Sequence, residues 1–248
     1  GVMGMVAGGG VLCKNTVYIS TSGCANDYAM DLFDDLPPHP DTAPTPIGPG
    51  AVLLHGFARD GAPALLQAIE SVLQQAPLRH LQTPGGYTMS VAMSNCGALG
   101  WVSSASGYRY AACDPLSGQP WPAMPACLRD LAQRAAAQAG YPHFAPDAAL
   151  INEYVPGAKL SLHQDKDELD LRAPIVSLSL GLPAVFLFGT ASRKDRPQRY
   201  RLVHGDVVVW GGPSRLAYHG VNALADGEHA LLGRRRLNVT FRCVGLPQ

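Results

Sequence analysis

The chain has 248 residues, with 19 basic and 19 acidic side chains and therefore no formal net charge. This length suits one β-rich domain with a sizeable core, so no second domain is required. Because the charges balance, contact with a polyanion must come from a local patch. The longest apolar run, residues 175–189, falls short of the roughly 20 residues that span a bilayer, which argues against a membrane protein.

The start of the chain carries little structural signal. Residues 1–29 have no basic residue before Lys14, which is unlike a secretory signal. The prolines between Pro37 and Gly50 predict a loop or lead-in.

Two helices are predicted in the first half. One should follow Asp60, which would cap it, and it has apolar residues at helical spacing: Leu65, Leu66, Ile69, Val72 and Leu73. The other should run from Pro122 or Pro125 to Ala139 and end at Gly140. Its core stripe would be Leu128, Leu131 and Ala135.

From Ala148 onward, short apolar or alternating segments separated by Gly and Pro predict strands. Their expected bounds are 148–154, 159–163, 174–180, 184–188, 200–204, 206–210, 215–221 and 236–242. This pattern predicts an α+β, β-dominated fold. It would be a β-sandwich or a double-stranded β-helix (jelly roll), with the N-terminal helices buttressing one side. Ser177 and Ser179 are expected to be sheet residues.

Three His-x-Asp pairs occur in the chain. On an extended strand, residues two apart project to the same side, so both side chains can meet one ion. This suits His163 and Asp165, which end the alternating segment 159–162. The pair at 39–41 lies in a proline-rich stretch, and the pair at 204–206 is expected in a turn. Spacing alone leaves open whether His163 is a ligand or a structural histidine.

The stretch 236–242 alternates strictly between polar and apolar residues. The apolar face belongs in a core, whereas the polar face could line an internal cavity. Arg236 and Arg242 would stand about 20 Å apart along the strand. Reaching inward from both ends, they suit the two carboxylates of a short diacid. An edge strand with a solvated cationic face remains the alternative.

Together with His219, the pair at 163 and 165 would place two imidazoles and one carboxylate on one face of Fe(II). Such a site leaves positions open for a keto acid and dioxygen. The segment Arg193–Arg201 holds five cations and one anion in an expected loop, either a nucleic-acid contact or a solvated charged loop. The six cysteines form no Cys-x-x-Cys pair, which fits reduced thiols in a cytoplasmic enzyme.

Five segments occur in one order: Thr83–Met93, Asn152–Tyr154, Pro156–Asp167, His204–Gly212 and Arg236–Arg242. With them, the chain resembles the bacterial AlkB proteins from about residue 30 to about residue 244. The resemblance implies a single Fe(II)- and 2-oxoglutarate-dependent dioxygenase domain over residues 30–248. That domain would include a nucleotide-recognition cover around residues 80–112. Residues 1–29 are then expected to be a disordered extension.

The resemblance also assigns roles to residues. Iron would be held by His163, Asp165 and His219, and 2-oxoglutarate by Asn152, Tyr154, Arg236, Asn238 and Arg242. Trp101 would stack on the substrate base opposite the His163 ring, and Asp167 would read its exocyclic amine. The remaining substrate contacts would come from Tyr108, Tyr110, Arg193, Thr83, Met93 and Gln164.

The implied reaction is oxidative demethylation of N1-methyladenine and N3-methylcytosine, which consumes O2 and releases formaldehyde, succinate and carbon dioxide. The implied partner is alkylated DNA, single- or double-stranded, with RNA as a further partner, and the enzyme would be a monomer. The base must leave its stack to reach a buried iron. The anion at Asp167 suits a cationic alkylated ring. On the residues alone, Trp101 also fits an ordinary core, and Asp167 a solvated turn.

Two other classes stay open. A related oxygenase acting on a protein, lipid or small molecule would share the iron and 2-oxoglutarate residues but would not need Trp101, Tyr108 and Asp167. A non-catalytic jelly-roll binding module would not need the three iron ligands together. Motifs of serine hydrolases, phosphate-binding loops and zinc proteases do not occur in the sequence.

Overall fold

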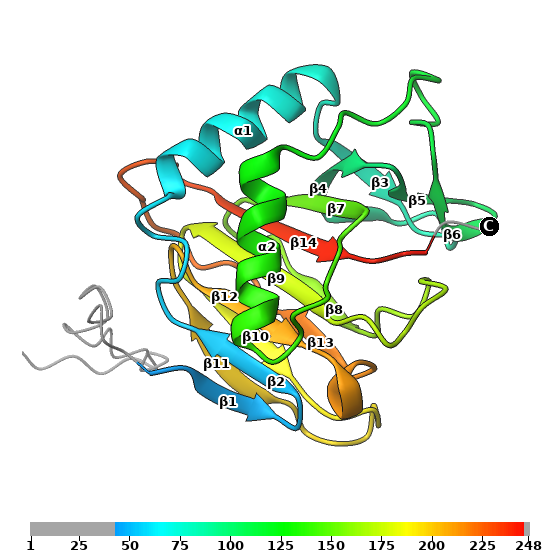
Figure 1. The fold of residues 1–248 in the computed structure, drawn as a ribbon. Coiled ribbons are helices and arrows are strands. Elements are labelled where there is room, and N and C mark those ends of the chain that lie inside the picture. Colours follow the sequence, from blue (N-terminus) through cyan, green and yellow to red (C-terminus); the bar gives the residue numbers. More distant parts are fainter. Residues whose placement is uncertain (1–42, 246–248) are drawn as a thin grey trace, which may run out of the picture. The chain divides into compact units, whose positions relative to one another are not determined.

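The computed structural model describes residues 43–245. These lie in Pro38–Gln248, one of the two units into which the chain divides. The predicted extension at 1–29 and the His-x-Asp pair at 39–41 lie outside the described residues. Within this unit, two helices lie over one face of a large sheet (Figure 1). They are α1 (Ala62–Gln75) and α2 (Ala126–Gln138).

The strands form three antiparallel sheets. The eight-stranded sheet has the order β1 (Thr45–Gly48), β2 (Ala51–Leu54), β12 (Val207–Trp210), β9 (Ile175–Gly181), β14 (Arg236–Arg242), β7 (Ala148–Tyr154), β4 (Thr88–Gly97) and β3 (Arg79–Gln82). The four-stranded sheet has the order β11 (Gln198–Leu202), β10 (Ala184–Phe188), β13 (His219–Val221) and β8 (Leu160–His163). A two-stranded sheet joins β5 (Gly100–Ser104) to β6 (Gly107–Ala111).

Two apolar cores lie on opposite faces of the eight-stranded sheet. One packs the buried stripes of α1 and α2 against that sheet and includes Ile69, Leu131 and Val239. The other lies between the eight-stranded and four-stranded sheets and includes Phe186 and Trp210. The β-dominated jelly roll with buttressing helices is therefore confirmed.

The strand β14 places polar side chains on the face of the large sheet that is turned toward the four-stranded sheet. Its apolar residues Leu237, Val239 and Phe241 belong to the helix-facing core. Its polar residues alternate with them and are also buried: Arg236, Asn238, Thr240 and Arg242 are only 1–7% exposed. The alternative of a solvated cationic face is therefore wrong, because β14 lies inside the sheet between β7 and β9.

The predicted cap of α1 is wrong. The residue before the helix is Gly61, and no side chain caps it. Pro63 occupies the first turn and has no N–H, so fewer donors there need an acceptor. The second helix runs as predicted, with Leu128, Leu131 and Ala135 buried.

Several predicted strand bounds also change. The lead-in contains β1, an edge strand of its sheet that tolerates Pro46 because an edge position needs no ladder donor there. The strand predicted at 215–221 is only β13, and the 3-10 helix η1 (Gly212–Ser214) and a loop precede it. The predicted loop at 193–201 ends in β11, and the cover at 80–112 contains strands that we did not predict individually.

Candidate active site

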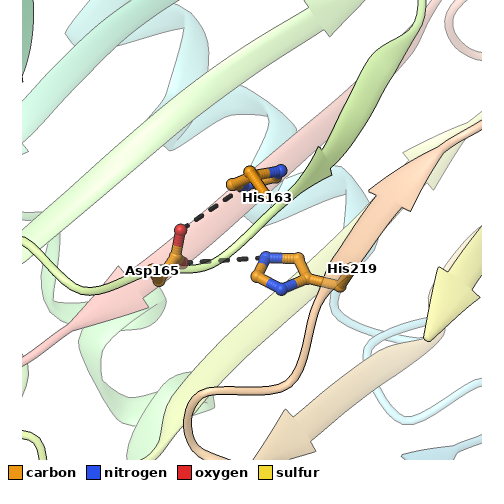
Figure 2. Close-up of side chains that lie close together, drawn as sticks. All are labelled: His163, Asp165 and His219. Atoms are coloured by element: carbon orange, nitrogen blue, oxygen red, sulfur yellow. Dashed lines mark ion pairs between the residues drawn. The ribbon is translucent and has the colours of Figure 1, made fainter. Parts of the chain in front are cut away.

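Three potential iron ligands converge where β8 meets β13. The two strands pair with His163 directly opposite His219, so both imidazoles lie on one side of the ladder. Asp165 lies two residues beyond the end of β8, as the expected strand end at residue 163 implies, and its carboxylate turns toward both rings (Figure 2). One ligand atom from each residue lies within 4.8 Å of the others. This donor set is the two-histidine, one-carboxylate arrangement of non-haem Fe(II) oxygenases.

In both histidines, a backbone hydrogen bond uses the Nδ1 atom, so the Nε2 atom remains available to a metal. The Nδ1 of His163 lies 2.9 Å from the Ser161 carbonyl, and the Nδ1 of His219 lies 2.9 Å from the Ala217 carbonyl. A carbonyl can only accept, so each Nδ1 carries a proton, and in the neutral ring each Nε2 then has a free lone pair. Backbone partners of this kind orient metal-binding histidines.

The charges around the three ligands also suit a cation. Burial alone would raise the pKa of Asp165, but the Arg242 charge and the hydrogen bond with His163 hold that pKa well below its usual value. Burial and the neighbouring His163 lower the pKa of His219 to about 4, so its imidazole is neutral. The carboxylate is thus ionised and the deeper imidazole uncharged at neutral pH, as metal ligation requires.

The buried polar face of β14 offers a site for a dicarboxylate. The Arg236 guanidinium donates to Ser179 Oγ at 2.9 Å and lies 5.0 Å from the Tyr154 ring centre. Its Nε and Nη1 find no acceptor among the described residues, and Asn152 Oδ1 also lacks a partner. Buried donors without acceptors are costly, so a bound carboxylate would fit here. At the other end of the strand, Arg242 contacts Asp165 Oδ2 at 2.6 Å, which places it beside the metal ligands.

A cavity of about 620 Å³ unites the sites. All the residues predicted for iron, 2-oxoglutarate and substrate lie in its lining. They are His163, Asp165, His219, Asn152, Tyr154, Arg236, Asn238, Arg242, Trp101, Tyr108, Tyr110, Asp167, Arg193, Thr83, Met93 and Gln164.

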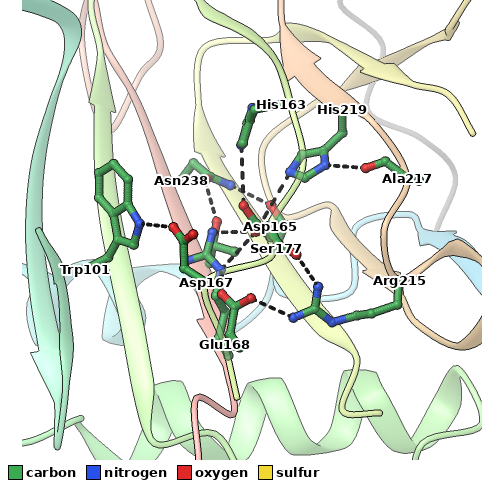
Figure 3. A network of polar contacts seen from close by, with 12 residues as sticks. Trp101, His163, Asp165, Asp167, Glu168, Ser177, Arg215, Ala217, His219 and Asn238 are labelled. Atoms are coloured by element: carbon green, nitrogen blue, oxygen red, sulfur yellow. Dashed lines mark hydrogen bonds and ion pairs between the residues drawn. The ribbon is translucent and has the colours of Figure 1, made fainter. Parts of the chain in front are cut away.

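At the outer part of the cavity, the Trp101 indole donates from Nε1 to Asp167 Oδ2 at 3.0 Å (Figure 3). Its ring stacks on Tyr108, with 5.2 Å between ring centres, while the His163 ring packs against His219. Trp101 is partly buried against the core between the sheets and also lines the cavity, and Asp167 is exposed but accepts a hydrogen bond from the indole.

Tyr110, expected from the resemblance to contact substrate, lines the cavity and is also bound to a buried carboxylate. Its hydroxyl donates to Glu168 Oε1 at 2.6 Å, and burial raises its pKa. Glu168 is buried, and it also pairs with Arg215 at 3.0 Å and Arg242 at 3.3 Å. Arg215 in turn donates to the backbone carbonyl of Asp165 at 2.7 Å.

We did not predict Glu168 or Arg215 from the sequence. Glu168 follows Asp167 in a charged stretch that resembles a solvated turn, and Arg215 lies in the segment wrongly predicted as strand. Only the fold brings them together, because 47 residues separate them.

The other motifs have structural roles. In the pair at 204–206, Asp206 accepts from the amides of Gly56 and Val203, and His204 Nδ1 accepts from Gly181, so this is the predicted turn. The described cysteines are unpaired: Cys96, Cys113, Cys127 and Cys243. Among residues 43–245, no helix is long and apolar enough to cross a membrane.

The fold and this site define the class of Fe(II)- and 2-oxoglutarate-dependent oxygenases, and the 2OG-Fe(II) oxygenase superfamily matches residues 50–242. The chain is 57% identical to the alpha-ketoglutarate-dependent dioxygenase AlkB of Escherichia coli K12 over 216 residues, covering 87% of this chain and 98% of that protein.

It is also 35% identical to the tRNA demethylase abh1 of Schizosaccharomyces pombe over 159 residues, covering 59% of this chain and 53% of that protein. The solved structure of OsALKBH1 matches with a TM-score of 0.70 at 28% identity and covers 81% of this chain and 99% of that one. The chain therefore belongs to the AlkB family and is an alpha-ketoglutarate-dependent, that is 2-oxoglutarate-dependent, dioxygenase.

Proposed function

We propose that this dioxygenase oxidatively demethylates N1-methyladenine and N3-methylcytosine in DNA, single- or double-stranded, and in RNA. It would act as a monomer in the cytoplasm, through one catalytic domain over residues 30–248. The observation that carries this proposal is the single cavity that joins three iron ligands to Trp101 and Asp167. The names of its relatives, a dioxygenase AlkB and a tRNA demethylase, point the same way.

In this proposal, His163, Asp165 and His219 hold the iron, and the unpartnered N–H groups of Arg236 receive the far carboxylate of 2-oxoglutarate. Arg242, already beside Asp165, faces the near end of the co-substrate. When bound, iron and 2-oxoglutarate supply the oxidation by O2 that hydroxylates an N-methyl group, with succinate and carbon dioxide as co-products. The hydroxymethyl group then leaves as formaldehyde and restores the base.

Asp167 and Trp101 would select the base. One oxygen of Asp167 accepts from the indole, which leaves the other oxygen for an exocyclic amine. An alkylated ring carries positive charge, and a carboxylate beside it favours that ring over a neutral base. The flat Trp101 ring offers a stacking surface for a base that has left its helix.

A mass-spectrometric assay tests the proposal. The protein is incubated with Fe(II), ascorbate, 2-oxoglutarate and an oligonucleotide carrying one N1-methyladenine. The mass of one methylene group should be lost only when 2-oxoglutarate is present. Asp167→Ala should still form succinate while repair falls, whereas His219→Ala should do neither. Repair by Asp167→Ala at the wild-type rate would refute the base-reading role.

The same assay separates the other classes. An oxygenase for a protein or small molecule would form succinate without changing the oligonucleotide. A binding module would hold no iron, so equal and negligible iron in the wild type and in Asp165→Ala would reject an enzyme altogether.

A further inference from the structure

Four exposed cations lie close together in the sequence, and the first of them lines the cavity: Arg193, Lys194, Arg196 and Arg199, called here the cationic strip. None of them forms an ion pair with a carboxylate of the described residues 43–245. The one acid in their midst, Asp195, accepts a hydrogen bond from Thr190 at 2.6 Å. In a chain without net charge, this is a strong local concentration of positive charge.

The strip begins at the cavity and leads away from it. Arg193 is part of the cavity lining, and its guanidinium lies 5.8 Å from the ring centre of Tyr218, the neighbour of the iron ligand His219. Arg199 lies on β11, where the next residue, Tyr200, packs toward the core between the sheets. Neighbouring strand residues project to opposite faces, so Arg199 points outward.

Protection of a sheet edge explains only part of the strip. Strand β11 is an edge of the four-stranded sheet, and exposed cations on such an edge discourage pairing with other chains. Lys194 and Arg196 precede the strand, however, in a loop with no ladder edge to protect. Their charge needs another reason.

We propose that the cationic strip binds backbone phosphates of the nucleic acid that flanks the target base. This inference rests on the proposed function, because it requires a nucleic-acid substrate. Arg193 would hold the strand where the base enters the cavity, and Lys194, Arg196 and Arg199 would carry the neighbouring phosphates along the outside of the four-stranded sheet. Such contacts position a strand without reading its sequence.

The first test measures binding and needs no turnover. The double variant Lys194→Gln/Arg196→Gln is compared with Arg134→Gln/Arg234→Gln, which removes equal charge from α2 and the β13–β14 loop, away from the cavity lining. Affinity for a labelled, unmodified single-stranded oligonucleotide of about 15 nucleotides is measured by fluorescence anisotropy between about 50 and 200 mM salt.

Each lost phosphate contact should lower the slope of log affinity against log salt by about 0.7. Across that salt range, the strip variant should therefore lose about sevenfold less affinity than the wild type. The control variant should keep nearly the wild-type slope. Equal slopes for the two variants would overturn the proposal.

The second test separates failure of the inference from failure of the function. Demethylation is followed on the long oligonucleotide and on a trinucleotide with a central N1-methyladenine. The strip variant should show a raised KM only on the long substrate. If the wild type repairs neither substrate, the function is wrong. If it repairs both and the strip variant matches the control, the function stands and the strip is only a solvated charged segment.

Discussion

Replacement of Arg236 by Met should separate stability from co-substrate binding. Arg236 is 1% exposed, and two of its nitrogens have no acceptor in the described structure. Each buried donor without a partner costs about 1–3 kcal/mol, so methionine would relieve about 2–6 kcal/mol. It would forfeit the bond to Ser179, about 1.5–3 kcal/mol for a charged donor, and the Tyr154 face contact, about 0.5–2 kcal/mol.

These contributions nearly cancel. The free energy of unfolding of Arg236→Met should therefore stay within about 1 kcal/mol of the wild type, or exceed it, without 2-oxoglutarate. Removal of one partner from a satisfied buried ion pair would instead cost about 3–5 kcal/mol. The wild type should gain about 2.7 kcal/mol at a 2-oxoglutarate concentration of about 100 Kd, and the variant almost nothing.

The assay is urea denaturation under anaerobic conditions with Fe(II), with and without 2-oxoglutarate. Arg235→Met is the matched control, because Arg235 is the preceding residue but pairs with Glu153 outside the cavity. It should keep the full response to 2-oxoglutarate. A loss of about 3 kcal/mol or more in co-substrate-free Arg236→Met, or an undiminished response to 2-oxoglutarate, would refute the reasoning.

Two further predictions concern other parts of the fold. Tyr110→Phe removes the hydrogen bond to buried Glu168. Amide hydrogen exchange in β5 and β6 should then be at least about tenfold faster, which corresponds to about 1.4 kcal/mol. An equal change in Tyr108→Phe, whose side chain is exposed, would contradict this prediction. Burial and the nearby His229 lower the pKa of His204 to about 4 from 6.5, so the unfolded chain binds a proton first as the pH falls. The free energy of unfolding should therefore fall as the pH is lowered from about 6.5 to about 4. His204→Asn keeps an acceptor for the Gly181 amide and should make this pH dependence shallower in urea denaturation. An unchanged pH dependence in this variant would contradict the prediction.

The sequence could predict what depends on local pattern. The alternation of residues 236–242 indicated a strand with one chemical face, and the spacing of residues 163 and 165 indicated two side chains that reach one ion. Both survive in the structure, although Asp165 lies beyond its strand. His219 was a candidate third ligand from its residue type, and the residues of the substrate side came through resemblance, not through spacing.

What could not be predicted depends on contacts between distant segments. Arg215 and Glu168 look like ordinary surface charges until the fold buries them against each other. The pairing of His163 with His219 is set by the register of β8 and β13, which no local pattern contains. The start of α1 was also predicted wrongly, because Asp60 resembles a helix cap. Gly61 precedes the helix instead, and Pro63 in the first turn reduces the number of N–H groups that need an acceptor.

The position of β14 between β7 and β9 links correct strand register to correct placement of the cavity residues. This strand pairs along its length with β7 and β9, and successive residues serve opposite cores. A slip of one residue would drive Leu237, Val239 and Phe241 into the cavity and turn both arginines toward the helices. That error would bury charge in an apolar layer, at a cost comparable to the whole stability of a domain. The pairing of β14 with β7 and β9 completes the sheet and also places Arg236 and Arg242 in the cavity. Molecules that are well folded but have these two arginines misplaced should therefore not accumulate.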